Sequence, residues 1–183
     1  NFGDAISEYI THKLSGKHVF HVPYDTKRIH YQCTGSILPV ATDKAIVWGT
    51  GFGYKENMFI SKPKKIHMVR GHYTAEMCKK LGVKDQIEVG DPCYLMDRLY
   101  QPKNTAKKYK LGIIPHYVDY GFCKEVFKNI EGVFIVDLLN EDYLETIDLI
   151  NSCEKCISSS LHGIIVSHAY GVPCMHVNFS DRL

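Results

Sequence analysis

Short apolar runs alternate with amphipathic stretches along most of the chain. Almost continuous apolar runs at residues 45–48, 111–114 and 133–136 predict buried strands. Between such runs, apolar residues recur at helical spacing, as in residues 4–14 and 161–170. The pattern therefore predicts strands and helices that follow one another in turn.

The remaining predicted elements complete this alternation. Gly82 and Gly171 are placed to end helices, and Asn140 is placed to cap one. Asn1 or Asp4 is a natural cap for the first helix. Further strands are predicted at residues 17–22, 31–34, 66–69, 156–157 and 173–177, and further helices at 74–81 and 121–129.

Strand–helix alternation with apolar strands indicates an α/β fold, with parallel sheets that are covered on both faces. A polar, basic stretch at residues 101–110 carries no apolar period and is interpreted as a linker. We therefore predict two Rossmann-like lobes, residues 1–100 and residues 111–183. The first residue is Asn1 and the last segment is a strand that has just ended, so we expect both lobes to be truncated at an outer edge.

Composition and charge narrow the class of protein. The 183 residues include 22 Lys and Arg against 20 Asp and Glu, a formal net charge of +2. This near-neutral balance argues against nucleic acid as the main partner, which needs clustered positive charge. No apolar run approaches the ~20 residues that span a bilayer. We expect a cytoplasmic protein, with peripheral association at the inner face of the membrane as an open alternative.

The 7 cysteines are expected to be reduced, partly buried thiols. Cys153 and Cys156 have CxxC spacing, but the sequence offers no second pair at the spacing of a zinc site. No metal site is predicted.

The most informative segment is the predicted strand-to-helix turn at residues 157–163. Ser158, Ser159 and Ser160 are followed by His162 in the first helical turn and by Gly163. The backbone N–H groups and the dipole of a helix N-terminus favour an anion, and glycine lets a ligand approach the backbone closely. A serine cap followed by a surface histidine is the simpler alternative.

Two more candidates follow other predicted strands. His116 comes directly after residues 111–114, and Arg70 after residues 66–69. In open α/β sheets, ligands bind outside the carboxyl ends of the strands, where these side chains should lie. The glycine-rich residues 49–53 lack the spacing of a dinucleotide loop and are better interpreted as a tight turn.

An ordered set of motifs resembles the polysaccharide pyruvyl transferase family. The motifs run through essentially the whole chain: NFGDA at residues 1–5, VWGTGF at 47–52, VRGxxTAE at 69–76, GDP at 90–92, GIIPHY at 112–117 and SSSLHGIIV at 158–166. The resemblance implies a two-lobed architecture similar to that of B-type glycosyltransferases. It also implies transfer of pyruvate from phosphoenolpyruvate to two hydroxyls of a sugar, which forms a cyclic ketal and releases phosphate.

The same resemblance suggests roles for the candidate residues. His162 would be the acid or phosphate partner, His116 the second acid or base, and Arg70 an anion clamp. The serine turn (Ser158, Ser159 and Ser160) and Gly163 would line the donor site, while Asn1 and Asp4 would face the acceptor. Gly3 would let a ligand approach the N-terminus of the first helix. Many family members carry Arg where this chain has Ser160, so Arg70 or a residue beyond Leu183 would supply that cation.

The expected partners are phosphoenolpyruvate, as donor substrate rather than cofactor, and a sugar or lipid-linked oligosaccharide of a cell-surface polymer. No cofactor is predicted. Two alternatives remain open at this stage: a nucleotide-sugar glycosyltransferase on the same fold, and a glycan-binding relative without catalysis.

Overall fold

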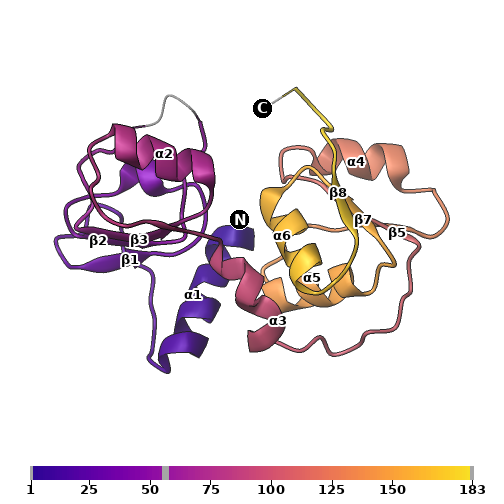
Figure 1. Cartoon of the computed structure of the whole chain (residues 1–183). Helices are drawn as coiled ribbons and strands as arrows, with labels where there is room; N and C mark the ends of the chain where they lie inside the picture. Colours follow the sequence, from indigo (N-terminus) through magenta and orange to yellow (C-terminus); the bar gives the residue numbers. More distant parts are fainter. Residues whose placement is uncertain (1, 55–57, 182–183) are drawn as a thin grey trace. The chain divides into compact units, whose positions relative to one another are not determined.

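The computed structural model describes residues 2–54 and 58–181, which pack as two compact units (Figure 1). Ile6–Pro92 form what we call the N-terminal unit. The C-terminal unit comprises the residues from Cys93 onward together with those up to Ala5. Helix α1, Phe2–Ser15, is therefore divided between the two units after Ala5.

The N-terminal unit contains a parallel four-stranded sheet in the order β1-β2-β3-β4. Helix α2, His72–Lys80, packs against β3 and β4, and the turn η1, Leu38–Val40, adds Leu38 to the core. Val47, Ile66 and Val69 from the central strands are at most 1% exposed. The strands are β1 His30–Gln32, β2 Ala45–Trp48, β3 Lys65–Val69 and β4 Glu88–Val89.

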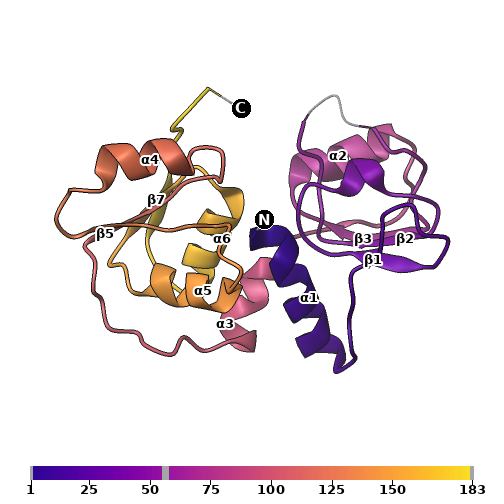
Figure 2. The same cartoon turned by 180° about the vertical axis from the view of Figure 1, so that it is seen from behind.

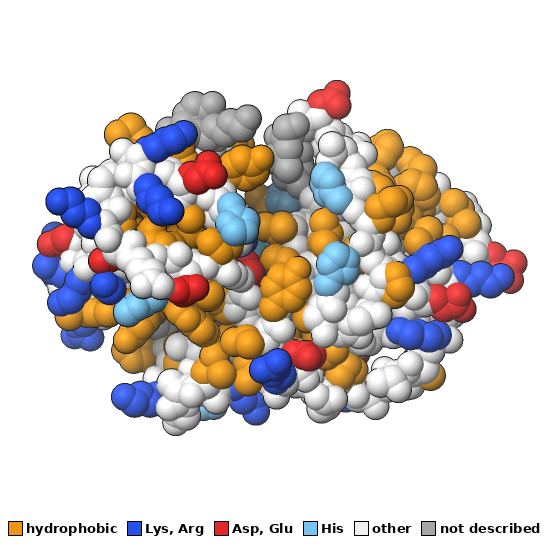
Figure 3. All heavy atoms as spheres, viewed as in Figure 1, with side chains coloured by type: hydrophobic (Ala, Val, Ile, Leu, Met, Phe, Trp, Pro, Cys, Tyr) orange, Lys and Arg blue, Asp and Glu red, His pale blue; other side chains and the backbone are white. Residues whose placement is uncertain are grey.

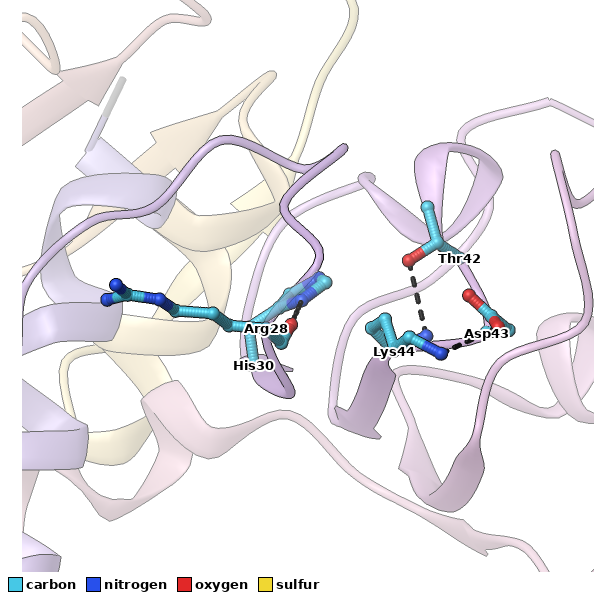
Figure 4. A network of polar contacts seen from close by, with 5 residues as sticks. All are labelled: Arg28, His30, Thr42, Asp43 and Lys44. Atoms are coloured by element: carbon cyan, nitrogen blue, oxygen red, sulfur yellow. Dashed lines mark hydrogen bonds and ion pairs between the residues drawn. The ribbon is translucent and has the colours of Figure 1, made fainter.

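Polar contacts anchor the amino ends of β1 and β2 (Figure 4). The His30 N–H donates to the Lys44 carbonyl at 3.2 Å, and the His30 ring lies 3.1 Å from the Arg28 carbonyl. An ion pair of 2.9 Å joins Lys44 to Asp43 on the surface, where such a pair contributes little. These charges lie at the amino ends of the strands. A ligand is expected at the opposite edge of the sheet, at the carboxyl ends of the strands.

The C-terminal unit contains a second parallel sheet, in the order β6-β5-β7-β8. Figures 1 and 2 show α4 on one side of this sheet, and α5 with α6 on the other. Its elements are η2 Pro92–Leu95, α3 Met96–Leu99, β5 Leu111–Ile114, α4 Tyr120–Phe127, β6 Val133–Ile135, α5 Tyr143–Asn151, β7 Cys156–Ser158, α6 Leu161–Ala169 and β8 Cys174–His176.

The strand order of this sheet reverses at β5. The chain adds β6 on one side of β5 and then returns to add β7 on the other side. The connections after β5 and β7 therefore lead to opposite sides of the sheet, and in open α/β sheets ligands bind at such a reversal, outside the carboxyl ends of the strands. In the N-terminal unit, the described strands follow one another in sequence order without such a reversal.

Helix α4 buries one side and leaves another exposed. Cys123 is fully buried, whereas Phe122 and Val126 are 55% and 51% exposed. Figure 3 shows apolar side chains at the surface in this part of the C-terminal unit. None of the helices in the described residues has both the length and the apolar character needed to cross a membrane.

The predicted α/β class with two parallel sheets is confirmed, and most elements lie within two residues of their predicted positions. Gly82 and Gly171 follow α2 and α6 with φ of +81° and +70°, as expected for glycines that end helices. The seven cysteines are free thiols, and all but Cys174 are buried.

The strand predicted at residues 17–22 is wrong, because this segment joins neither sheet. Phe20, its main apolar residue besides Val19, is 62% exposed. Apolar residues without a neighbouring strand or a covering layer do not form a strand, and the local pattern carries no information about such neighbours.

The predicted cap at Asn140 is also wrong. Asp142 caps α5, and its carboxylate accepts hydrogen bonds from the N–H groups of Leu144 and Glu145, both at 3.0 Å. Asn140 instead accepts from the Asp142 N–H at 3.0 Å and so forms the turn that precedes the cap. For α1, the proposed cap Asn1 lies outside the described residues, and Asp4 lies within the first turn.

Residues 101–110 run along α5 of the C-terminal unit. The Lys103 N–H donates to Asp148 at 3.1 Å, the Lys108 N–H to the Ser152 carbonyl at 2.7 Å, and the Lys107 ammonium to the Asn151 carbonyl at 2.8 Å. The division into lobes at residues 100 and 111 stays a prediction.

Replacing the cap of α5 should lower stability measurably. Asp142→Ala leaves two N–H groups of the first turn without their acceptor, which costs about 1 kcal/mol. Urea denaturation should detect this loss. Glu141→Ala, which removes the exposed carboxylate one residue earlier, should stay within about 0.5 kcal/mol of the unsubstituted protein. An equal loss in both variants would mean that charge rather than capping stabilises α5.

Candidate functional site

The serine turn after β7 is built into the protein by its own hydrogen bonds. The Ser158 hydroxyl is fully buried, donates to the Ile114 carbonyl at 2.7 Å and accepts from the Ser160 N–H at 3.0 Å. It therefore ties the end of β5 to the end of β7. Because this hydroxyl is used within the fold, its main role is to hold the two strand ends together.

Ser160 caps α6, as the sequence predicts. Its hydroxyl accepts from the Gly163 N–H at 3.5 Å, and Ser160 is 5% exposed. A Cβ at Gly163 would lie 2.6 Å from the Ser158 Oγ and 2.7 Å from the Ile114 Cγ2. Gly163 thus lets the first turn of α6 pack directly on the strands, a packing role in addition to the predicted ligand approach.

Ser159 joins the loop after β7 to the loop after β5. Its hydroxyl donates to the Asp119 carboxylate at 2.9 Å and accepts from the His116 N–H at 2.9 Å. Ser180 donates to the other carboxylate oxygen of Asp119 at 2.6 Å. Asp119 and Ser180 are members of this network that the sequence analysis missed. The one local signal is an aspartate directly before a predicted helix, and that position is typical of a cap.

His116 lies on this loop and is half-buried. Its Nδ1 accepts from the Val118 N–H at 3.4 Å, and its ring packs on Tyr117 with 4.2 Å between centroids. When Nδ1 accepts a backbone N–H, a neutral imidazole carries its proton on Nε2. In that tautomer Nε2 can donate a hydrogen bond to a ligand.

His162 lies in the first turn of α6, against the first turn of α1. A Cβ at Gly3 would lie 2.3 Å from the Cε1 and Nδ1 of His162, so only glycine leaves room for this ring. The Phe2 N–H donates to the Leu138 carbonyl at 3.1 Å, which fixes α1 at the carboxyl end of β6. Asp4, on the same turn, is exposed.

Arg70 belongs to the N-terminal unit, where it follows β3. Its guanidinium donates to the Ser36 hydroxyl at 2.6 Å, and its backbone N–H donates to the Thr50 carbonyl at 3.2 Å. Thr50 is fully buried, donates to the Gly35 carbonyl at 2.8 Å and accepts from the Ile37 N–H at 3.1 Å. Residues 49–53 thus form a turn that is held by hydrogen bonds and accepts the backbone N–H of Arg70.

The structure thus groups the predicted residues in two places. In the C-terminal unit, the loops after β5 and β7 bring His116 and the serine turn to the switch point, and His162 lies on the adjoining helix turn. In the N-terminal unit, Arg70 and Ser36 lie at the carboxyl ends of the sheet. In the N-terminal unit the fork-shaped guanidinium suits a carboxylate or phosphate, and in the C-terminal unit the N-terminus of α6 favours an anion.

Comparison with known proteins identifies the family of the chain. The family described as "Polysaccharide pyruvyl transferase" matches residues 23–181, which include both sheets. The chain belongs to this family.

Two relatives illustrate the similarity. The chain is 34% identical over 186 residues to "Uncharacterized protein L143" of Acanthamoeba polyphaga mimivirus, covering 98% of this chain and 64% of that protein. It is 30% identical over 159 residues to "Succinoglycan biosynthesis protein ExoV" of Rhizobium meliloti (strain 1021), covering 81% of this chain and 46% of that protein. The chain thus spans less than two thirds of the length of either relative. No solved structure matches it.

Gly3→Ala should displace the His162 ring. The new Cβ would lie 2.3 Å from two ring atoms, so the ring or the helix must move, and overpacking of this kind costs about 1–3 kcal/mol. NMR of ¹³C-labelled histidines should show a shifted His162 signal. Gly121→Ala is a matched control, because Gly121 is also the second residue of a helix and its Cβ would meet nothing within 4 Å. An unshifted His162 signal in Gly3→Ala would contradict this packing.

Proposed function

We propose that the full-length protein transfers pyruvate from phosphoenolpyruvate to a sugar of a cell-surface polysaccharide. The observation that carries this proposal is the family match over residues 23–181, which includes the two histidines at the switch point. The relative ExoV supports a polysaccharide as the acceptor, because its name places it in succinoglycan biosynthesis.

The proposed reaction begins with a proton transfer. A general acid protonates the methylene carbon of phosphoenolpyruvate, which leaves positive charge on the adjacent carbon. One sugar hydroxyl attacks that carbon, a second hydroxyl replaces the phosphate by cleavage of the carbon–oxygen bond, and both hydroxyl protons pass to a base or to the phosphate. The products are a cyclic ketal and inorganic phosphate. A histidine suits the acid because its ordinary pKa lies near neutrality.

His162 is the proposed acid or phosphate partner. In the first turn of α6 the helix dipole disfavours a positive charge on its ring. A trianionic donor bound at the same helix end offsets that penalty, so donor binding itself would favour the protonated ring. His116 is the proposed second acid or base.

Arg70 is proposed as a clamp for the carboxylate or phosphate of the donor, since a guanidinium offers paired N–H donors. Ser36 holds that guanidinium at 2.6 Å and would keep it oriented. Asp4, together with Asn1, is proposed to face the acceptor sugar or lipid-linked oligosaccharide. A lipid-linked acceptor would bring the protein to the inner face of a membrane. No cofactor is proposed, and phosphoenolpyruvate takes part as the donor substrate.

Incubation of the full-length protein with phosphoenolpyruvate and candidate glycans should release phosphate and produce the methyl signal of a pyruvate ketal. His162→Ala should lower kcat by about 10²–10⁴-fold, the usual contribution of a general acid. Arg70→Lys should mainly raise KM for phosphoenolpyruvate. His168→Gln is the control, because it changes an exposed histidine of the same helix.

Ketal formation that is unaffected by His162→Ala would remove this residue from the mechanism. Transfer from a nucleotide-sugar in place of phosphoenolpyruvate would show a glycosyltransferase. Glycan binding without turnover would show a binding protein. Either of these two results would overturn the proposed activity.

A further inference from the structure

Asp119 stands at the N-cap of α4 but does not cap it. No N–H of the first turn donates to its carboxylate. An aspartate at this position normally accepts such a bond, worth about 1 kcal/mol. Asp119 is only 4% exposed, and its two oxygens instead accept the hydroxyl protons of Ser159 and Ser180. Helix α4 therefore forgoes a favourable terminal bond, and the carboxylate is directed toward the switch point.

The bond to Ser159 sets the direction of the next bond. A serine hydroxyl has one proton and two lone pairs. Because Ser159 gives its proton to Asp119, it can only accept from the His116 N–H, which it does at 2.9 Å. Because its acceptor is a carboxylate, the hydrogen bond from Ser159 to Asp119 is stronger than a bond between neutral groups, and it polarises the Ser159 hydroxyl. The Ser159 oxygen is therefore a better acceptor for the His116 N–H.

The backbone of Asp119 also holds His116, because these two residues are the first and last of a four-residue turn. The Asp119 N–H donates to the His116 carbonyl at 2.8 Å, so both backbone polar groups of His116 are held through Asp119, one directly and one through Ser159. The His116 ring projects from this four-residue turn. Misplacement of a catalytic group by about 1 Å can cost a factor of 10² in rate, so the rigidity of the turn bears on the chemistry.

We propose that Asp119 is the positioning residue for His116 and that it acts through the Ser159 hydroxyl. Its catalytic consequence rests on the proposed function, whereas its effect on the geometry of His116 does not. The competing role is purely structural, in which Asp119 ties down the C-terminal segment through Ser180. These two roles use different oxygens of the same carboxylate, Oδ2 for Ser159 and Oδ1 for Ser180, so they can be separated.

The test compares the full chain with four variants by NMR of ¹³C-labelled histidines and by amide hydrogen exchange, with His116→Gln used to assign the His116 ring signal. Asp119→Ala and Ser159→Ala should shift the ring signal of His116 and speed exchange of its N–H at least tenfold. Asp119→Asn should stay close to the unsubstituted chain, because its amide oxygen still accepts from Ser159. Ser180→Ala, the matched control, should leave both readouts unchanged.

Kinetics extend the same comparison. Asp119→Ala should lower kcat by ten- to a hundredfold with KM for phosphoenolpyruvate within twofold, and Ser180→Ala should change neither. If Asp119→Ala does not fold, Ser159→Ala breaks the same chain of bonds and carries the test. Absence of turnover in the unsubstituted protein would refute the proposed function while the NMR comparison still decides the positioning role. An unchanged His116 signal in the variants that break the chain, or an equal shift in Ser180→Ala, would overturn that role.

Discussion

The hydrogen bonds at the carboxyl ends of β5 and β7 are the interactions on which the candidate site depends. At this edge the strands end, yet their polar groups remain buried and need partners. Ser158 bonds the Ile114 carbonyl, Ser159 bonds the His116 N–H, and Ser160 caps α6. Three consecutive hydroxyls thus end two strands and begin a helix, next to the turns that carry His116 and His162.

Packing around the candidate site also requires that two positions carry no side chain. Gly163 brings α6 onto the strands, and Gly3 brings α1 onto the ring of His162, because a methyl group at either position would overlap neighbouring atoms. In both cases the glycine allows close packing rather than flexibility of the backbone. The same residues that resemble a ligand-binding motif in the sequence are therefore also required by the packing of the fold.

Local pattern was sufficient for the described strands other than β4, for α6 and for a serine cap before it, because each depends on neighbours within a few residues. The network around Asp119 could not be predicted, since Ser159 and Ser180 are far from it in sequence and its position suggests a cap. The error at Asn140 has a smaller cause: two polar residues in one turn compete for the cap, and only Asp142 has the spacing that reaches the Leu144 and Glu145 N–H groups. The strand predicted at residues 17–22 does not form because no neighbouring strand pairs with it, and a local sequence pattern carries no information about such a neighbour.

The contact of Gly3 with His162 also has a consequence for biosynthesis. The C-terminal unit is completed by residues 2–5, which leave the ribosome long before His162 does. During synthesis the first turn of α1 must therefore wait for its packing partner, with Phe2 unable to reach the Leu138 carbonyl. Contacts between residues that are far apart in the sequence form slowly and late in folding. The candidate site should thus be among the last parts of the C-terminal unit to form.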